Sequence, residues 1–485
     1  METFPTRPQP LENPAGTDLA ANVVPRVLDG VAEDMVLSTY AEAKNAIVFG
    51  IELEGALEQE AMKVALAIAV TKFPQFLCRV EPTGSFFGKR LVWASDPEVQ
   101  SELIVSGLDT ADTSDSLQDA LLRHLDDSLH KEWDLLKTVP TEFHLISLAE
   151  DRHCFILLVH HAAADAWTLS QFIRELLGCY QETVTGEKPT WAEQPGRASR
   201  LRRRVANPKR SFLRDLLFVA RLAANARLRK QPFRKVRSNL GTCEEHHTRA
   251  KLSCDETERI QRIASEANVP TLDLLVAATN RAMDKWNASH DMPAGTITTA
   301  ITVQMRNRYG PRNAPVNSSA IYLRSRSGER TDPAEFVRLT AGRRTRELRS
   351  RSDVRAAQAS RTLADAVRFL PLSARKKTMY SFLKRPLFSL LITFLERGWP
   401  EFGSRRLSGD TYLEAELCGM EVTDLYAVGH RLAIRTPLRV WGIMFRNRLH
   451  LLLTASGNHF SRSDAEVLTD LVAETLLENP FENAS

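Results

Sequence analysis

Two adjacent histidines followed by an aspartate, His160, His161 and Asp165, are the residues of this chain whose types and spacing suit catalysis. An unperturbed imidazole titrates near about pH 6.5, so it can accept and return a proton at neutral pH. A run of large apolar residues precedes the pair, and three alanines that leave room for a ligand follow it. The pattern predicts a general base at the end of a buried strand. The alternative interpretation is a pair of buried histidines with a structural role only.

The neighbouring residues predict a strand, a turn and a helix around the histidines. Residues 155–159 are uniformly apolar, as in a strand that is covered on both faces. Thr168 followed by Gln171 forms a capping-box pattern for a helix start. Because side chains alternate along a strand, His160 should point away from the face of His161, and we interpret it as structural. Apolar residues at helical spacing then follow: Leu169, Phe172, Ile173, Leu176 and Leu177.

Length and composition bound the class of protein. The 485 residues are enough for two to four domains or for one large two-lobed enzyme. The six cysteines are scattered, which suits a reducing compartment, and neither a signal peptide nor an apolar run of ~20 residues is visible. We therefore expect a cytoplasmic protein. Cys243, His246, His247 and Cys254 match no usual zinc spacing, so we expect no metal.

The net charge of +4 is unevenly distributed. Residues 197–237 contain 15 Lys/Arg and one acid, Asp215, so the rest of the chain is net negative. Apolar residues recur between these arginines at helical spacing, which predicts a basic amphipathic helix. Such a helix either contacts a membrane surface or an acidic partner, or it is a connecting helix packed on the core. Neither aromatic interleaving nor a known binding module accompanies the charge, so we expect no nucleic acid.

The order of predicted elements divides the chain into two α/β halves. Residues 1–16 are rich in proline and polar residues and are expected to form a disordered tail. Residues 17–190 are predicted to form an N-terminal lobe that carries the histidines. A basic helical linker is predicted over 191–240, and a C-terminal lobe over 241–485.

Two further helices have predicted features that the structure tests. The closing helix of the chain has a capping-box pattern at Ser463 with Glu466. A helix predicted over 57–72 has an apolar stripe that faces the core, made of Leu57, Ala61, Val64, Ala65 and Ile68.

The run from His160 to Asp165 matches the HHxxxD signature of the CoA-dependent acyltransferase superfamily. That group includes chloramphenicol acetyltransferase, condensation domains of non-ribosomal peptide synthetases, and bacterial wax ester synthase/diacylglycerol acyltransferases. Residues 45–80 also resemble the opening strand and helix of the family, and the Trp-Asp-Leu run at 133–135 resembles its approach to the next strand. Residues 302–306, with Asn317 downstream, resemble a strand of its second half.

The resemblance implies an α/β fold of two chloramphenicol-acetyltransferase-like lobes. Each lobe would be a mixed β-sheet with helices, and the active-site tunnel would lie at their interface. By the same resemblance, the side chain of His161 faces this channel as the general base, and Asp165 pairs with Arg306 to hold the turn. A backbone N–H near Ala166 is a candidate oxyanion donor, and Asn317 is a candidate substrate-binding residue.

Two departures from the family pattern keep a second hypothesis open. Ala166 replaces the glycine that is usual in condensation domains, and no DFGWG-like run is visible in the second half. The leading hypothesis is an acyltransferase without a bound cofactor, which moves an acyl group from acyl-CoA or a phosphopantetheinyl carrier-protein thioester. The acceptor would be a hydroxyl or amine of a small molecule or lipid. The alternative is a catalytically inactive, condensation-like binding or scaffold protein. The basic segment 197–237 is a candidate contact for an acidic acyl carrier protein or for a membrane surface.

Overall fold

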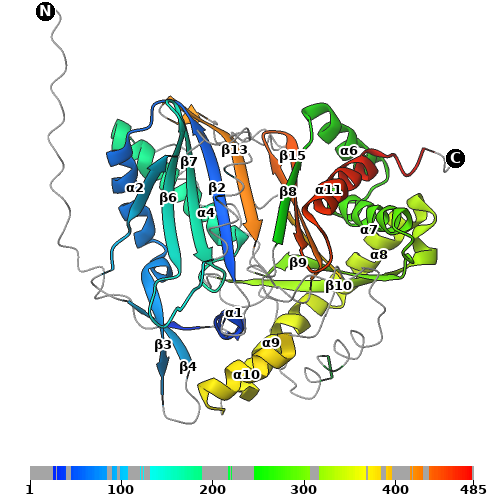
Figure 1. Ribbon diagram of the computed structural model, residues 1–485, viewed down its shortest axis with the longest axis horizontal. Helices are drawn as coiled ribbons and strands as arrows, with labels where there is room; N and C mark the ends of the chain where they lie inside the picture. The colour runs from blue at the N-terminus through cyan, green and yellow to red at the C-terminus, as the bar shows by residue number, and fades with distance from the viewer. Residues whose placement is uncertain are drawn as a thin grey trace, which may run out of the picture.

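Two lobes, each built on a six-stranded mixed sheet, form the part of the chain that the structure describes (Figure 1). The structure is a computed structural model. It describes residues 26–28, 30–39, 45–84, 90–95, 99–107, 121, 124, 131–187, 217–218, 220, 245–305, 316–367, 370–383, 389–395, 416–417, 419–429 and 436–482. The predicted two-lobed α/β architecture is confirmed.

The sheet of the first lobe has β7 near its centre. Its strands lie in the order β12 (Glu416–Leu417), β13 (Met420–Gly429), β2 (Ala46–Glu54), β7 (Arg152–His160), β6 (Thr141–Ala149) and β5 (Leu103–Gly107). Strand β5 runs parallel to β6, and the other neighbours are antiparallel. Helices α2 (Gln59–Thr71) and α4 (Ala166–Thr185) pack against each other beside this sheet. Phe172 of α4 contacts Phe143 of β6, with ring centroids 5.6 Å apart. This cover explains why β7 is buried from its third residue to its end.

The sheet of the second lobe faces the first across the middle of the molecule (Figure 1). Its strands lie in the order β10 (Ser318–Arg326), β9 (Thr296–Gln304), β11 (Leu390–Leu395), β14 (Leu438–Phe445), β15 (Arg448–Ser456) and β8 (Glu245–Lys251). Strand β11 runs parallel to both of its neighbours. The outer side of the lobe carries α6 (Cys254–Glu266), α7 (Thr271–Ser289), α8 (Pro333–Arg349) and α11 (Arg462–Leu477).

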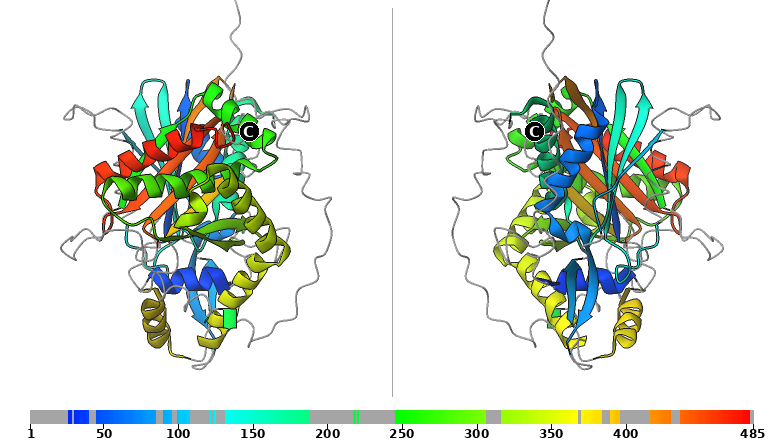
Figure 2. Two further views of the ribbon diagram at one scale, coloured as in Figure 1. Left: turned by 90° about the vertical axis from the view of Figure 1, so that its right-hand side faces the viewer. Right: turned by 90° about the vertical axis from the view of Figure 1, so that its left-hand side faces the viewer.

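A smaller sheet and three helices close the lower side of the molecule. The sheet has the order β1 (Arg26–Val27), β4 (Arg90–Ser95) and β3 (Cys78–Thr83). Helix α1 (Gly30–Thr39) packs against α9 (Ser352–Val367) and α10 (Leu372–Leu383), as both side views show (Figure 2). Glu33 of α1 and Arg375 of α10 form an ion pair, and each is only 1% exposed. This buried pair ties the start of the chain to its second half.

Strands β12 and β13 belong to the second half of the chain and complete the sheet of the first lobe. Strand β13 pairs antiparallel with β2 along its length, from Glu421 opposite Glu54 to Gly429 opposite Ile47. Six of its residues belong to the core of the first lobe: Met420, Val422, Leu425, Tyr426, Ala427 and Val428. The second half of the chain therefore contributes strands to both sheets.

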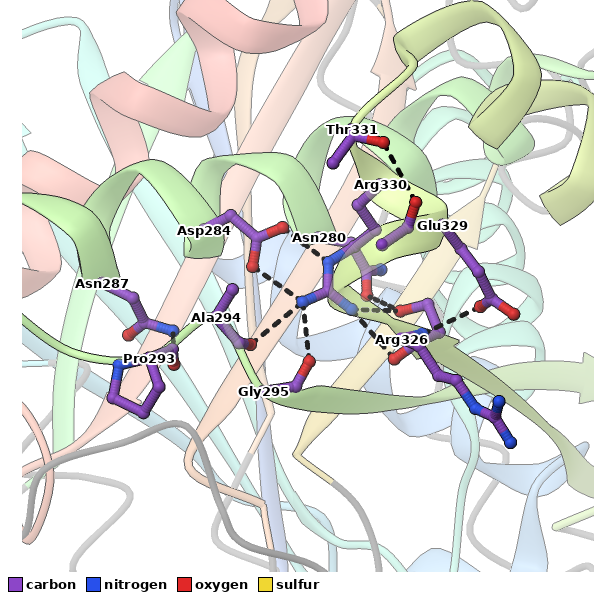
Figure 3. A network of polar contacts seen from close by, with 12 residues as sticks. Asn280, Asp284, Asn287, Pro293, Ala294, Gly295, Arg326, Glu329, Arg330 and Thr331 are labelled. Carbon is purple, nitrogen blue, oxygen red and sulfur yellow. Dashed lines mark hydrogen bonds and ion pairs between the residues drawn. The ribbon is translucent and has the colours of Figure 1, made fainter.

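Arg330 anchors the far end of the second lobe, as Figure 3 shows. Its Nε and Nη2 atoms donate to the two carboxylate oxygens of Asp284 at 2.6 and 2.8 Å. Nη1 donates to the carbonyl of Ser325 at 2.9 Å, and Nη2 also donates to the carbonyls of Ala294 and Gly295. One buried guanidinium thereby fixes the end of β10 against α7 and the chain entering β9. Such a fork suits arginine because its donors are planar and rigid.

The start of α11 differs from the prediction. The helix is capped by Ser461, whose Oγ accepts from the N–H of Asp464 at 3.1 Å, and not by Ser463 with Glu466. The Asp464 carboxylate in turn accepts from the N–H of Ser461 at 2.8 Å. The capping box requires a side chain that reaches back three residues, and aspartate serves at this position although the usual pattern has Glu or Gln.

The apolar stripe predicted for α2 is also partly wrong. Val64 and Ile68 are 46% and 42% exposed, so they face away from the core. The buried face keeps Ala61 and Ala65 and otherwise lies about one position further along the helix: Ala61, Met62, Ala65, Leu66, Ala69 and Val70. The helix is apolar around most of its circumference, so periodicity alone did not orient it.

Candidate active site

The end of β7 directs two adjacent imidazoles to different neighbours. The main-chain N–H of His160 donates to the carbonyl of Pro140, just before β6, at 2.7 Å. The N–H of His161 donates in the other direction, to the carbonyl of Asn45, just before β2. Successive residues of a strand point to opposite faces. Main-chain bonds on both sides therefore fix the backbone at the two histidines, and alternation along the strand directs their side chains to different faces.

His160 is a fully buried structural residue. Its Nδ1 accepts from the N–H of Ala162 at 3.1 Å, so its Nε2 carries the proton and donates to the hydroxyl of Thr39 at 2.7 Å. Thr39 is the last residue of α1, which places that helix against the strand end. Burial, assisted by the neighbouring His161, lowers the pKa of His160 to about 3. The ring is neutral throughout the physiological range and has both nitrogens occupied.

His161 is partly exposed and has one ring nitrogen committed to the turn. Its Nδ1 lies 2.8 Å from the carbonyl oxygen of Ala164. A carbonyl can only accept, so Nδ1 carries the proton, and Nε2 of the neutral ring carries a lone pair. Burial lowers the pKa of His161, whereas the bond to Ala164 and the charge of Asp165 oppose that shift. The neutral imidazole, which is the form able to accept a proton, is therefore favoured at neutral pH.

Asp165 holds the turn and connects it to the second lobe. It is the N-cap of α4, and one carboxylate oxygen accepts from both the N–H and the hydroxyl of Thr168 at 3.0 Å. The other oxygen accepts from the main-chain N–H of Asn317 at 2.9 Å. The predicted cap at Thr168 with Gln171 is thus wrong. The helix begins three residues earlier, because a carboxylate near the positive end of a helix is the stronger cap.

Of the remaining predicted site residues, the structure describes Ala166 and Asn317 but not Arg306. Ala166 is the first residue of α4, so its backbone is helical and does not require the freedom of glycine. Its N–H lies at the helix start, and its role as an oxyanion donor stays a prediction. Asn317 is buried just before β10 and contacts Asp165 through its main chain. Arg306 lies outside the described residues, so its pairing with Asp165 also stays a prediction.

No group of three or more potential metal ligands is found within the described part of the chain. Cys243 lies outside that part. The Nδ1 of His247 lies 3.0 Å from the hydroxyl of Thr454 on the neighbouring strand, which accounts for one of its ring nitrogens.

Comparison with known proteins matches this geometry to one family. The model of the condensation domain matches residues 47–300, which is more than half of the chain and includes both histidines and Asp165. The chain belongs to the condensation-domain family. An isonitrile lipopeptide synthase of Mycobacterium tuberculosis (strain ATCC 25618 / H37Rv) is 27% identical over 145 residues, which are 30% of this condensation-family chain and 6% of that protein. The chain thus spans only a small part of the length of such relatives.

Solved structures show the same fold across both lobes. The first condensation domain of the calcium-dependent antibiotic synthetase, in complex with a substrate analogue, has a TM-score of 0.64. It is 16% identical, and the match covers 96% of this condensation-family chain and 98% of that one. The trichothecene 15-O-acetyltransferase TRI3 from Fusarium sporotrichioides has a TM-score of 0.63 at 14% identity and covers 93% and 94% of the two chains. The same fold is therefore found in a condensation domain and in an acetyltransferase.

The second lobe of this condensation-family chain brings a buried arginine towards His161. Arg439 of β14 is 3% exposed, and its charge lowers the pKa of His161. Its Nη1 donates to the carbonyl of Gly429 at 2.9 Å, and its Nη2 pairs with Glu245 of β8 at 3.2 Å. Sequence reasoning missed Arg439 because a single arginine at the start of an apolar strand is usually exposed. The ion pair of Arg439 with Glu245 is apparent only after β14, β15 and β8 are assembled in one sheet.

Across the described helices, none combines the length and apolar character that a membrane span requires. The predicted basic amphipathic helix lies almost entirely outside the described residues, so membrane contact through 197–237 stays a prediction.

Proposed function

We propose that this condensation-family chain is an acyltransferase that moves an acyl group from a thioester to a hydroxyl or amine acceptor, with His161 as the general base. The observation that carries the proposal is the bond from Nδ1 of His161 to Ala164 at 2.8 Å, which leaves the lone pair of Nε2 for a substrate proton. Membership of the condensation-domain family supports acyl transfer as the class of reaction.

The proposed reaction proceeds through a tetrahedral intermediate. Nε2 of His161 removes the proton of the acceptor O–H or N–H as that atom bonds to the thioester carbonyl carbon. The C–S bond then breaks, and the imidazolium returns the proton to the leaving thiolate. The products are an ester or amide and a free thiol, and no acyl-enzyme is formed. General-base catalysis of this kind contributes about 10²–10⁴-fold to the rate.

The hydrogen bonds around the turn support an ordered base. Asp165 holds the start of α4 and the main chain of Asn317, so the turn that accepts the Nδ1 proton is fixed from both lobes. His160 has both ring nitrogens occupied and a pKa of about 3, which makes it unsuitable as the base at neutral pH. His161 is therefore assigned the proton transfer.

The donor is proposed to be acyl-CoA or an acyl group on the phosphopantetheinyl arm of a carrier protein. The matched relatives include an isonitrile lipopeptide synthase and linear gramicidin synthase subunits. The similarity to these synthases favours the carrier-bound donor. TRI3, in contrast, is named as an acetyltransferase that acts on oxygen, and its similarity keeps acyl-CoA as a proposed donor. The acceptor is proposed to be a small molecule or a lipid.

The test is thiol release from a panel of acyl-CoA and acyl-carrier thioesters, with amine and alcohol acceptors. We expect acceptor-dependent thiol release by the wild type and its loss, by about 10²–10⁴-fold, in His161→Gln. Circular dichroism and urea unfolding of the variant confirm that it is folded. A folded wild-type chain that releases no thiol with any pair would instead favour the catalytically inactive binding protein.

Peripheral membrane contact is a separate part of the proposal. The 15 basic residues within 197–237 would favour an anionic lipid surface. Sedimentation with phosphatidylserine vesicles, with and without this segment, tests it, since equal binding by both forms removes the segment from the account.

A further inference from the structure

We propose that Arg439 is a positioning residue for this reaction: its buried guanidinium ties the second lobe to the first beside His161 and presents a fixed positive charge to the imidazole. The inference rests on the proposed function of His161 as the base. It begins from a feature that the HHxxxD motif does not include, a buried arginine on the strand of the second lobe that faces the first.

The side of β14 on which Arg439 lies is the side that meets the first lobe. Leu438 and Val440 belong to the core of the second lobe, whereas Ile443 and Phe445 belong to the core of the first. Arg439 has the same parity as Ile443 and Phe445, and alternate residues of a strand share a face. The guanidinium therefore points across the seam.

The hydrogen bonds of Arg439 connect both sheets. Nη2 pairs with Glu245 of β8, which lies in the sheet of the second lobe. Nη1 donates to the carbonyl of Gly429, the last residue of β13, which lies in the sheet of the first lobe. One side chain thus fixes the separation of the two sheets at the end of β13.

That end of β13 lies at the level of His161. Gly429 pairs with Ile47 of β2, two residues from Asn45, whose carbonyl binds the main chain of His161. Two residues along β2 and one spacing between neighbouring strands separate the carbonyls of Gly429 and Asn45 by roughly 8 Å. The charge of Arg439 is buried, so salt screens its interaction with the imidazole weakly.

Other charged and titratable groups lie on the elements around this seam. Asp165, at the start of α4, opposes the effect of Arg439 on the pKa of His161. His160 of β7 is neutral above about pH 3. Glu245 and His247 of β8 lie on the wall of the second lobe, and Glu245 partly neutralises the guanidinium.

The effect on the base has a definite sign. A neighbouring positive charge disfavours the imidazolium, so Arg439 keeps Nε2 of His161 unprotonated to lower pH. Removing that charge should raise the pKa of His161, and removing the opposing charge of Glu245 should lower it. A role limited to packing would change neither.

The test is the titration of the His161 ring by ¹H–¹³C NMR of the full chain, with its resonance assigned by its absence in His161→Ala. We expect Arg439→Met to move the midpoint to higher pH, Glu245→Gln to move it to lower pH, and Arg439→Lys to leave it near that of the wild type. The acid limb of kcat/KM should move in the same directions. This titration requires no turnover, so it remains informative if the chain releases no thiol.

The double variant Arg439→Met/Glu245→Gln guards against misfolding, because it leaves neither charge buried alone. We expect its midpoint to lie above that of the wild type, by less than in Arg439→Met. A folded Arg439→Met, or a folded double variant, whose His161 titrates at the wild-type midpoint overturns the proposal. If these shifts are observed but the wild-type chain releases no thiol with any donor and acceptor, the proposed function alone is overturned.

Discussion

Replacing Asp165 with alanine should destabilise the protein through two separable losses. The carboxylate caps α4 through Thr168, and loss of such a cap costs about 1 kcal/mol. The same change leaves the buried N–H of Asn317 without this acceptor, which costs about 1–3 kcal/mol. The free energy of unfolding should therefore fall by about 2–4 kcal/mol.

Asp165→Asn separates the two losses. Asparagine is as good an N-cap as aspartate, so its side-chain oxygen should keep the bond to Thr168. Its amide nitrogen then faces the N–H of Asn317, where two donors meet. We expect a loss of about 1–3 kcal/mol, smaller than that of the alanine variant. Because the Asp165 charge raises the pKa of His161, the acid limb of kcat/KM should also move to lower pH.

Urea unfolding of the purified chain, followed by circular dichroism, measures both variants. The matched control is Asp151→Ala, an exposed aspartate in the turn between β6 and β7, which should change stability by less than about 0.5 kcal/mol. Asp165→Ala unfolding at the wild-type midpoint with an unchanged slope would refute the reasoning. Equal losses of unfolding free energy in the alanine and asparagine variants would refute the division between the cap on Thr168 and the bond to the N–H of Asn317.

Three further perturbations test the frame that holds the site. Glu33→Gln leaves the buried guanidinium of Arg375 without its ion-pair partner, and urea unfolding should show a loss of about 3–5 kcal/mol. Gly429→Ala places a methyl group 2.5 Å from the indole ring on β14, so it should cost about 1–3 kcal/mol by the same assay, whereas Gly107→Ala meets no atom within 4 Å and should be nearly neutral. Burial lowers the pKa of His450 to about 3, so the folded state excludes a proton that the unfolded state binds below about pH 6.5. Stability should therefore fall as pH drops from about 6.5 towards 3, and His450→Gln should reduce that slope; an unchanged slope would contradict it.

Local patterns in the sequence were sufficient for the elements that carry the motif. Residues 155–159 predicted the buried strand that became β7, and the apolar spacing after Thr168 predicted α4. Both signals are strong because burial on two faces and a helical stripe impose clear periodicities. The start of α4 was misplaced because Asp165 was assigned a pairing role, although an aspartate before an apolar helical run is itself a cap signal.

Features that depend on long-range pairing were not predictable in the same way. The apolar run at 390–395 is the central strand β11, but short apolar runs do not distinguish strand from helix. Strand β13 lies in the sheet of the other half of the chain, and no local pattern specifies a partner some 370 residues away, as between Tyr426 and Gly50. The role of Arg439 follows from that pairing because it donates to Gly429 of β13, and the role of Asn45 follows from the pairing of β2 with β7.

Single-turnover thiol release by His161→Ala is the most direct test of His161 as the base. The variant retains the fold-determining contacts of His160 and Asp165. The acyl donor is mixed with excess enzyme and acceptor, so that product release does not limit the rate. We expect a rate constant lower than that of the wild type by about 10²–10⁴-fold, partly restored by added imidazole. A folded His161→Ala that releases thiol at the wild-type rate would contradict this expectation.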